Sequence, residues 1–213
     1  MERMWADDNV AFATSLHMLD PSWRSETFPL AGGHAVLCGV GLFVNVALSC
    51  GVTVDLQPND LERLELRCSA VGVTPAIELT VASTTVSRQV VIERGYRLTA
   101  KTSALSRAMD DDVVPDDSIE IRTVAGQDDR SVWQQAAAEG WGHDTGTRRR
   151  ASDAFAAAAF ATDGQTLFVG LDHCAGQRVG TQPDAAGLCA LARQGDVRTR
   201  TLRFRSPLCE PAG

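Results

Sequence analysis

The residues best suited to nucleophilic chemistry in this chain stand alone rather than in combinations. His173 and Cys174 are neighbours in a stretch that predicts a turn, and no G-x-S-x-G pattern occurs in the sequence. A hydrolase or thiol enzyme needs a nucleophile and a base that the fold holds within hydrogen-bonding distance. Two adjacent turn residues do not provide this geometry. We therefore regard an unrelated hydrolase or thiol enzyme as the least favoured function.

Metal binding is not predicted either. The six cysteines, at positions 38, 50, 68, 174, 189 and 209, include no C-x-x-C pair, and His17 and His34 are interpreted as packing or surface residues. The first residues lack the basic region and apolar core of a signal peptide, so we expect a cytoplasmic protein with reduced cysteines. We therefore interpret the six cysteines as structural residues whose thiols are not paired in disulfides.

Two further stretches resemble ligand-binding motifs only in part. Gly39-Val40-Gly41 follows a predicted strand, as in dinucleotide-binding turns, but the third glycine is missing and residues 42–48 predict extended chain rather than helix. Residues 110–117 hold five aspartates and a proline, without the glycine that a calcium-binding loop needs for its turn. We interpret the first as a turn between strands and the second as an acidic linker.

Composition narrows the class of protein. The chain has 213 residues, of which 44% are hydrophobic and 22% charged, and its net charge is −7. This length suits one large or two small globular domains. The negative charge disfavours nucleic acid as a partner, because phosphate binding depends on clustered Lys and Arg. No apolar run reaches the roughly 18 residues of a membrane span, so no membrane partner is expected.

The first 109 residues predict alternating helices and strands. In chain order, we expect a helix at 8–19, an irregular connector with Trp23 and Phe28, a strand at 34–38, extended chain at 42–48, a helix at 58–71, a strand from 75 to 81, a helix after the capping hydroxyls at 83–85, and a strand at 96–105. The strand from 75 follows from the alternation of Ile77 and Leu79 with Glu78 and Thr80. Gly95 suits the end of the preceding helix.

A second alternation follows the acidic linker. We expect a strand at 119–124, a helix at 127–139 ended by Gly140, a helix at 152–161, a strand at 166–171 and a strand at 178–180. Asp163-Gly164 is a typical turn before the strand. Beyond about residue 182 neither periodicity is sustained, and we expect an irregular tail.

Both halves resemble parts of the GNAT superfamily of N-acetyltransferases. The order helix, Glu93-Arg94-Gly95-Tyr96, strand is similar to the closing unit of a GNAT domain, where the helix ends in Gly followed by Phe or Tyr. The order strand, helix, helix, strand around Asp163-Gly164 is similar to the opening half. The chain thus resembles a two-lobed bacterial GNAT protein over residues 8–181, which implies an α/β fold with a mixed sheet flanked by helices. The implied domains are a degenerate lobe at 1–109, the linker at 110–117 and an incomplete lobe at 118–213.

The resemblance implies transfer of an acetyl group from acetyl-CoA to an amine. In the family, acetyl-CoA lies against a strand, a loop of pattern Q/R-x-x-G-x-G/A and a helix, whose N–H groups hold the pyrophosphate. Gln177 and Gly180 match part of this pattern, but Gln182 fills the last small position, and no complete loop is found. We therefore expect impaired acetyl transfer. The alternative is a non-catalytic binding or dimerisation module on the same fold.

The resemblance also indicates where an acceptor pocket would lie. Glu139, Trp141 and His143 occupy the helix end that borders this pocket in GNAT proteins. The catalytic residues are not identifiable, because the amine itself is the nucleophile and no signature triad is required. The implied partners are a small-molecule or peptide amine and, in a dimer, a second copy of the chain.

A frameshift would explain the missing loop. Read one or two nucleotides on, residues 198–202 and 203–212 can encode G-R-G-R and V-Q-I-A-L-M-R-T-R, which resemble the family's loop and the helix that follows it. The hypothesis places the shift between about Thr181 and Arg193 and leaves the second lobe truncated.

Overall fold

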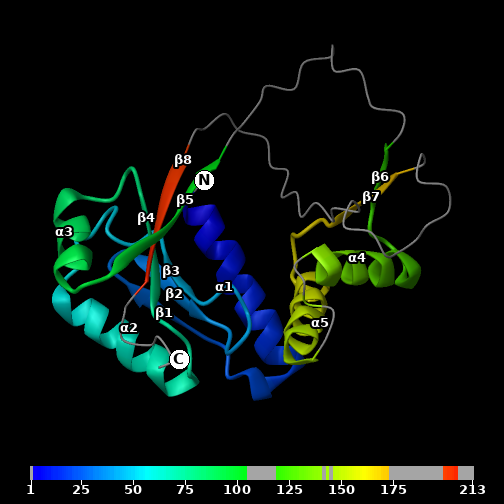
Figure 1. Ribbon diagram of the computed structural model, residues 1–213, viewed down its shortest axis with the longest axis horizontal. Coiled ribbons are helices and arrows are strands. Elements are labelled where there is room, and N and C mark those ends of the chain that lie inside the picture. Colours follow the sequence, from blue (N-terminus) through cyan, green and yellow to red (C-terminus); the bar gives the residue numbers. More distant parts are fainter. Residues whose placement is uncertain (1, 105–118, 141–142, 144–145, 173–198, 206–213) are drawn as a thin grey trace, which may run out of the picture. The chain divides into compact units, whose positions relative to one another are not determined.

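The structure, a computed structural model, describes residues 2–104, 119–140, 143, 146–172 and 199–205. The chain divides into two compact units (Figure 1). Unit 1 comprises residues 1–106 together with 196–213, and unit 2 comprises residues 107–195. Unit 2 therefore lies, in sequence, inside unit 1.

Unit 1 is a mixed six-stranded sheet with helices on both faces. Its elements are α1 (Glu2–Leu19), the 3-10 turn η1 (Pro21–Trp23), β1 (Glu26–Leu30), β2 (Gly33–Leu37), β3 (Val46–Leu48), α2 (Pro58–Val71), β4 (Ala76–Thr80), α3 (Thr85–Glu93), β5 (Arg97–Ala104) and β8 (Thr199–Arg205). The strand order is β1-β2-β3-β4-β8-β5, in which β3 and β4 are parallel and the other pairs antiparallel. The predicted α/β class with a mixed, helix-flanked sheet is confirmed.

The alternation of side chains along β3 and β4 divides the core into two layers. Val46, Leu48 and Ala76 form a buried cluster with Ala6 of α1 on one face. Ala47, Ile77 and Leu79 join the larger cluster on the other face, to which α2 contributes Leu61, Leu64 and Cys68, and α3 contributes Val91. A central strand that is covered on both faces is expected to be apolar throughout, as β3 is. The core of unit 1 thus holds the parallel pair β3–β4 between α1 and the helices α2 and α3.

Local sequence signals explain the limits of α2 and α3. Gln57 and Asp60 form a capping box at the start of α2, with Pro58 at the first helical position, and Gly72 ends the helix with φ 74°. Thr84 caps α3, since its hydroxyl accepts a hydrogen bond from the N–H of Ser87 at 3.1 Å. These boundaries are the ones that the sequence predicts.

The segment before β2 differs from its prediction. Phe28 lies in strand β1 rather than in an irregular connector, with the guanidinium groups of Arg63 and Arg67 each 5.6 Å from its ring centre. Pro29 masks the strand pattern in the sequence, but a proline is tolerated in an edge strand. Arg63 donates a hydrogen bond to the carbonyl of Pro29 at 2.7 Å, which occupies this edge of the sheet.

The predicted extended run at 42–48 is correct only at its end. Only Val46–Leu48 form a strand. The residues before it form a loop that Asn45 organises, because its side-chain oxygen accepts from the N–H groups of Cys38 and Gly39 at 2.7 and 3.1 Å. Its amide group donates to the carbonyl of Gly39 at 2.8 Å. An Asn that replaces backbone partners in this way produces a loop where periodicity alone predicts strand.

The expectation of an irregular tail is wrong for residues 199–205. They form β8, which pairs antiparallel with β4 on one side and with β5 on the other. The sequence does not reveal this strand, because strand pairing with partners about a hundred residues away is invisible to local periodicity. The strand also belongs to the sheet of unit 1, and not to the second lobe.

Unit 2 has the predicted order strand, helix, helix, strand. Its described elements are β6 (Ile119–Thr123), α4 (Gln127–Gly140), α5 (Gly146–Ala161) and β7 (Phe168–Asp172), and β6 pairs antiparallel with β7. Trp133 of α4 is 2% exposed and packs against Phe155 and Phe160 of α5, with ring centres 6.4 and 5.3 Å away. The other buried residues of α5 are four alanines and Ser152, so these three aromatic side chains are the large apolar groups in contact between the two helices.

Several predictions fall on residues that the structure does not describe. These are the acidic linker at 110–117, the turn at 173–176, the strand at 178–180, and the Gln177 and Gln182 positions. The domain boundaries at 109 and 118 therefore stay predictions.

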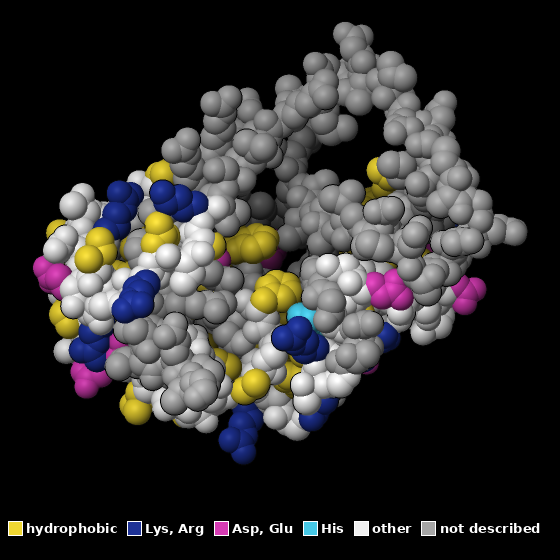
Figure 2. Space-filling view, viewed as in Figure 1, with side chains coloured by type: hydrophobic (Ala, Val, Ile, Leu, Met, Phe, Trp, Pro, Cys, Tyr) yellow, Lys and Arg dark blue, Asp and Glu magenta, His cyan; other side chains and the backbone are white. Residues whose placement is uncertain are grey.

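In the described part of the chain, no helix is both long and apolar enough to cross a membrane. Figure 2 shows Lys and Arg side chains scattered over the face in view, with exposed apolar side chains between them.

Candidate functional site

The predicted acceptor region lies at the C-terminal end of α4. Glu139 is in the last turn of the helix, directly before Gly140. His143 lies beyond the helix end, and its backbone N–H donates to the carbonyl of Ala138 at 2.7 Å. Trp141 lies outside the described residues. Glu139 and His143 thus belong to one helix end, while the position of Trp141 stays a prediction.

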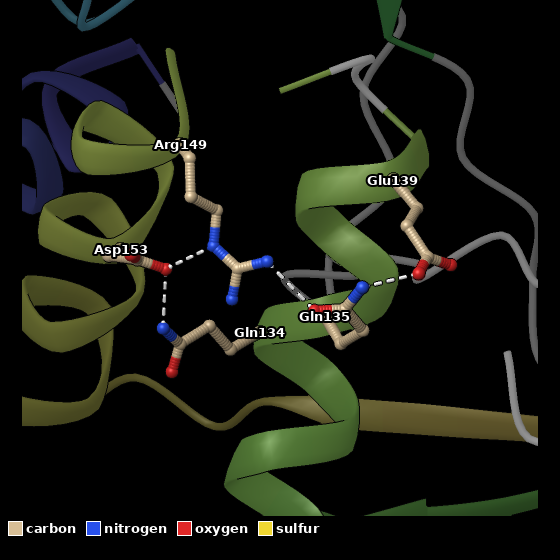
Figure 3. Close-up of polar contacts among 5 residues, drawn as sticks. All are labelled: Gln134, Gln135, Glu139, Arg149 and Asp153. Carbon is tan, nitrogen blue, oxygen red and sulfur yellow. Dashed lines mark hydrogen bonds and ion pairs between the residues drawn. The ribbon is translucent and has the colours of Figure 1, made fainter. Parts of the chain in front are cut away.

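Glu139 is the end of a chain of polar side chains that crosses from α4 to α5 (Figure 3). The amide group of Gln135 donates to the Glu139 carboxylate, and the Gln135 carbonyl oxygen accepts from Arg149 at 2.8 Å. Arg149 also donates through Nε to Asp153 at 2.8 Å. The amide of Gln134 donates to the same Asp153 oxygen at 2.6 Å. We call these five residues the α4–α5 polar chain.

Arg149 is the centre of the α4–α5 polar chain. Figure 3 shows its guanidinium group between the two helices, with Gln135 on one side and Asp153 on the other. The side chains of Arg149 and Asp153 are 32% and 42% exposed, so solvent reaches the chain. Gln135 and Glu139 are half-buried. Such a network fixes the geometry of its members without sealing them from small polar molecules.

The chemistry available at this helix end is that of an oriented carboxylate. One oxygen of Glu139 accepts from Gln135, and the other has no hydrogen-bond partner among the described residues. A carboxylate of this kind can hold an ammonium group or accept a proton from an amine. Among the residues described at this helix end, no nucleophile and base are paired. The described residues also contain no group of three or more His, Cys, Asp or Glu that could hold a metal.

Sequence reasoning missed four members of the α4–α5 polar chain. Two of its contacts could have been predicted from the sequence. They join residues four positions apart on one helix face, Gln135 to Glu139 and Arg149 to Asp153. The contacts that join the two helices were not, since they depend on how α4 packs against α5. The aromatic trio around Trp133 sets that packing.

Unit 1 offers a second place for a ligand, at the carboxyl ends of the parallel strands β3 and β4. Ligands of α/β sheets often bind where such strands end. Here the loop at 49–57 fills the position, and three hydroxyl-bearing residues of the α3 start hold it in place. Ser83 donates to the carbonyl of Cys50 at 3.2 Å, the N–H of Thr84 donates to Gly51 at 2.8 Å, and Ser87 accepts from the N–H of Leu56 at 3.0 Å. We call Ser83, Thr84 and Ser87, with the loop that they bind, the hydroxyl closure.

The helix start beside the hydroxyl closure does not suit a pyrophosphate. Pro58 has no N–H, the N–H of Gln57 donates to the Asp60 carboxylate at 3.1 Å, and the N–H of Asp60 donates to Gln57 at 3.0 Å. The carboxylates of Asp55 and Asp60 lie in the same loop and helix start, and Arg63 forms an ion pair with Asp60 at 3.6 Å. This helix start therefore offers few free N–H donors to a pyrophosphate.

The described cysteines of unit 1 are poorly suited to nucleophilic chemistry. Cys38, Cys50 and Cys68 are buried and are not in disulfides. Burial raises the pKa of Cys38 to about 12, and burial together with the charge of Asp60 raises the pKa of Cys50 to about 12. Both thiols are therefore protonated at neutral pH, whereas the reactive form is the thiolate. Burial also raises the pKa of Tyr96, which is 4% exposed and belongs to the core.

Comparison with known proteins gives one distant likeness. No family model matches the chain, and no curated protein matches it. Among solved structures, a GCN5-related N-acetyltransferase from Kribbella flavida is similar, with a TM-score of 0.46 and 12% sequence identity. The likeness covers 93% of this chain and 96% of that chain. At this identity no residue role carries over.

Proposed function

We propose that this chain is an acetyl-CoA-dependent N-acetyltransferase-like protein of the GNAT type, in which unit 1 is a lobe that does not bind acetyl-CoA. The acceptor would be a small-molecule or peptide amine held beside the end of α4, near Glu139, Trp141 and His143. Acetyl transfer is impaired, because the sequence of this chain lacks a recognisable pyrophosphate loop. A cytoplasmic location belongs to the same proposal and rests on the sequence.

The observation that carries the proposal is the hydroxyl closure. Unit 1 has the order strand, loop, helix, parallel strand that resembles the family's acetyl-CoA site, and yet its loop is bound to α3 at Cys50, Gly51 and Leu56. The N–H groups of Gln57 and Asp60 at the start of α2 are used within the capping box, and Pro58 has none, so few donors are left for a phosphate. Any acetyl-CoA chemistry would therefore belong to unit 2, where the end of α4 is the proposed acceptor side.

The second candidate is a non-catalytic binding or dimerisation module on this fold. It is favoured by unit 1, which has a well-packed core on both faces of a six-stranded sheet. A lobe of this kind can serve as a rigid support. The two candidates differ in whether acetyl-CoA binds to unit 2.

Acetyl-CoA titration followed by hydrogen exchange on the full chain separates these alternatives. We expect calorimetric affinity weaker than low micromolar, because each missing charge-assisted hydrogen bond to the pyrophosphate costs about 1.5–3 kcal/mol. We also expect unchanged exchange at residues 49–60. Slower exchange confined to unit 2 supports the transferase, and no slower exchange anywhere supports the module. Low-micromolar binding with slower exchange at 49–60 would overturn the proposal.

The proposal does not require a frameshift. Residues 199–205 pair in register with two strands, which an unselected out-of-frame sequence has no reason to do. Reading the coding DNA tests the frameshift directly. An intact frame through residues 181–193 would remove that hypothesis and leave the closure of unit 1 unaffected.

A further inference from the structure

A pocket of about 480 Å³ lies in unit 1 where three segments of the chain meet. These segments are the turn between β1 and β2, the loop at 49–57 and the start of α2, and every residue that lines the pocket belongs to unit 1. The volume falls within the range of small-molecule sites, about 300–1,000 Å³. The pocket is therefore large enough for a small ligand.

Two of the walls of this pocket are fixed against each other. The carbonyl of Ala31 in the turn accepts a hydrogen bond from the N–H of Gly51 in the loop at 3.0 Å. At Gly32, which has φ 78°, an added Cβ atom would lie 2.5 Å from Oγ1 of Thr53, so the turn and the loop approach each other closely. The pocket is thus formed without a ligand, and binding requires little reorganisation.

The charges around the pocket determine the sign of its ligand. Two aspartates and one arginine are the lining residues whose type stays charged throughout the neutral pH range. Arg63 lies 3.6 Å from the Asp60 carboxylate, donates to the carbonyl of Pro29 at 2.7 Å and lies over the ring of Phe28. Arg63 and Asp60 therefore neutralise each other, and Asp55 carries the charge that is not compensated.

The Asp55 carboxylate is held in place and is accessible. One of its oxygens accepts a hydrogen bond from the hydroxyl of Thr84, the capping residue of α3. The other oxygen has no hydrogen-bond partner among the described residues, and Asp55 is exposed to solvent. A carboxylate with a free oxygen binds an ammonium group through a charge-assisted hydrogen bond.

An apolar surface lies beside this carboxylate. Val54, the neighbour of Asp55 in sequence, lines the pocket although it is 56% exposed. Pro29 and Leu30 line the pocket from the side of β1. An apolar chain that covers these residues is removed from water, which favours binding. The pocket thus combines one uncompensated negative charge with an apolar wall.

We propose that this pocket binds a primary amine with a short apolar chain. The ammonium group pairs with the free oxygen of Asp55, and the chain lies against Val54 and Pro29. An anionic ligand is disfavoured, because the positive charge of Arg63 is already paired with Asp60. This inference goes beyond the proposed function, since it assigns a ligand to unit 1 and holds whether or not acetyl transfer takes place at the end of α4.

The test follows the backbone amide signals of the full chain, labelled with heavy nitrogen, in nuclear magnetic resonance spectra. The probe is n-butylammonium chloride at pH 7. We expect saturable shifts at residues 31–34 and 53–57 at millimolar concentrations of the probe. Methylammonium should bind more weakly because it cannot cover the apolar wall, and butyrate, which has the opposite charge, should cause no saturable shift.

Two variants with the same change of charge show whether Asp55 is responsible. Asp55→Asn should weaken the binding of n-butylammonium about two- to fivefold, the range expected for a partly exposed ion pair. Glu62→Gln is the matched control, because Glu62 is an exposed carboxylate of α2 that does not line the pocket, and its affinity should be unchanged. The amide signals far from the substitutions show that both variants are folded.

Four results would overturn the inference. The first is the absence of a saturable shift at residues 31–34 and 53–57. The second is equal weakening by Asp55→Asn and Glu62→Gln, which would indicate general attraction to a negatively charged chain. The third is binding of butyrate or methylammonium as tight as that of n-butylammonium. The fourth is a shift confined to residues 139–143, which would instead support the acceptor position of the proposed function.

Discussion

The hydroxyl closure of unit 1 and the α4–α5 polar chain of unit 2 are two polar networks with opposite surroundings. Ser83 and Ser87 in the closure are buried, and their main partners are backbone groups of the loop at 49–57. Arg149 and Asp153 are partly exposed, and their partners are other side chains. The two networks therefore differ in two ways. The hydroxyl closure is buried and binds backbone groups, whereas the α4–α5 polar chain is partly exposed and joins side chains.

This difference separates a structural network from one that is available to a ligand. A buried hydroxyl that satisfies a backbone N–H cannot exchange that partner for a ligand without leaving the N–H unsatisfied. A half-exposed carboxylate such as Glu139 keeps an oxygen for a solute at little cost. In unit 1 the hydroxyls are thus committed to the loop at 49–57, whereas the Glu139 carboxylate at the end of α4 is only half-buried.

Removal of one hydroxyl should have the largest effect. Ser87→Ala is expected to destabilise unit 1 by about 2 kcal/mol, because it leaves the buried N–H of Leu56 without a partner. Ser131→Ala is the matched control, since its hydroxyl donates to the carbonyl of Gln127 on an exposed part of α4. Urea unfolding compares the two variants. If both lose less than about 0.5 kcal/mol, the closure is not a structural network.

Alkaline pH should affect unit 1 through its buried thiols. The pKa of an unfolded thiol is near 9.0, whereas burial raises the pKa of Cys38 and of Cys50 to about 12. Between these values the unfolded chain binds fewer protons than the folded one. The free energy of unfolding therefore falls as pH rises, by up to ~1.4 kcal/mol per pH unit for each thiol, and the contribution is complete below pH ~9.

Urea unfolding at pH 8 and pH 10 measures this slope. The variant Cys38→Ala/Cys50→Ala should show a smaller fall over the same interval, although its stability at pH 8 is also lower. The described part of unit 2 contains no cysteine, so its unfolding should lack this contribution. An unchanged slope in the double variant would show that these thiols do not cause it.

The smallest effect is expected in the α4–α5 polar chain. Arg149→Met should cost about 0.5–1 kcal/mol, because ion pairs that are this exposed contribute little. Arg148→Met, on the exposed side of the same helix, is the matched control and should be near neutral. Thermal unfolding of both variants is the measurement. If Arg149→Met lowers the free energy of unfolding by more than about 2 kcal/mol, the α4–α5 polar chain behaves like a buried network. The difference between the networks of the two units would then be wrong.

Local signals predicted most of the described elements. The capping residues of α2 and α3, the alternation along β4 and the strand–helix–helix–strand order of unit 2 were readable because each rests on neighbours in sequence. The errors have non-local causes. Phe28 lies in a strand that pairs with β2, and Arg63 and Arg67 lie over its ring. Strand β8 pairs with β4 and β5, which are about a hundred residues earlier in the chain.

The predicted site residues stay a prediction, and the α4–α5 polar chain around Glu139 was not foreseen. The sequence indicated the helix end at Glu139 through family resemblance, but not the contact of Arg149 with Gln135, which depends on packing between two helices. It also gave no sign that the loop at 49–57 is bound by Ser83 and Ser87, since hydroxyl residues beside a helix start predict only a cap. Polar networks that join distant segments become visible only in three dimensions.

The late position of β8 also has a consequence during translation. It leaves the ribosome roughly 95 residues after β5, so at ~5–20 residues per second the gap between β4 and β5 stays open for on the order of ten seconds. During that time β4 and β5 present unpaired edges on a nascent chain. On polysomes, where identical nascent chains lie close together, those edges would be a natural target for molecular chaperones, and chaperone dependence of folding would be the cellular trace of this topology.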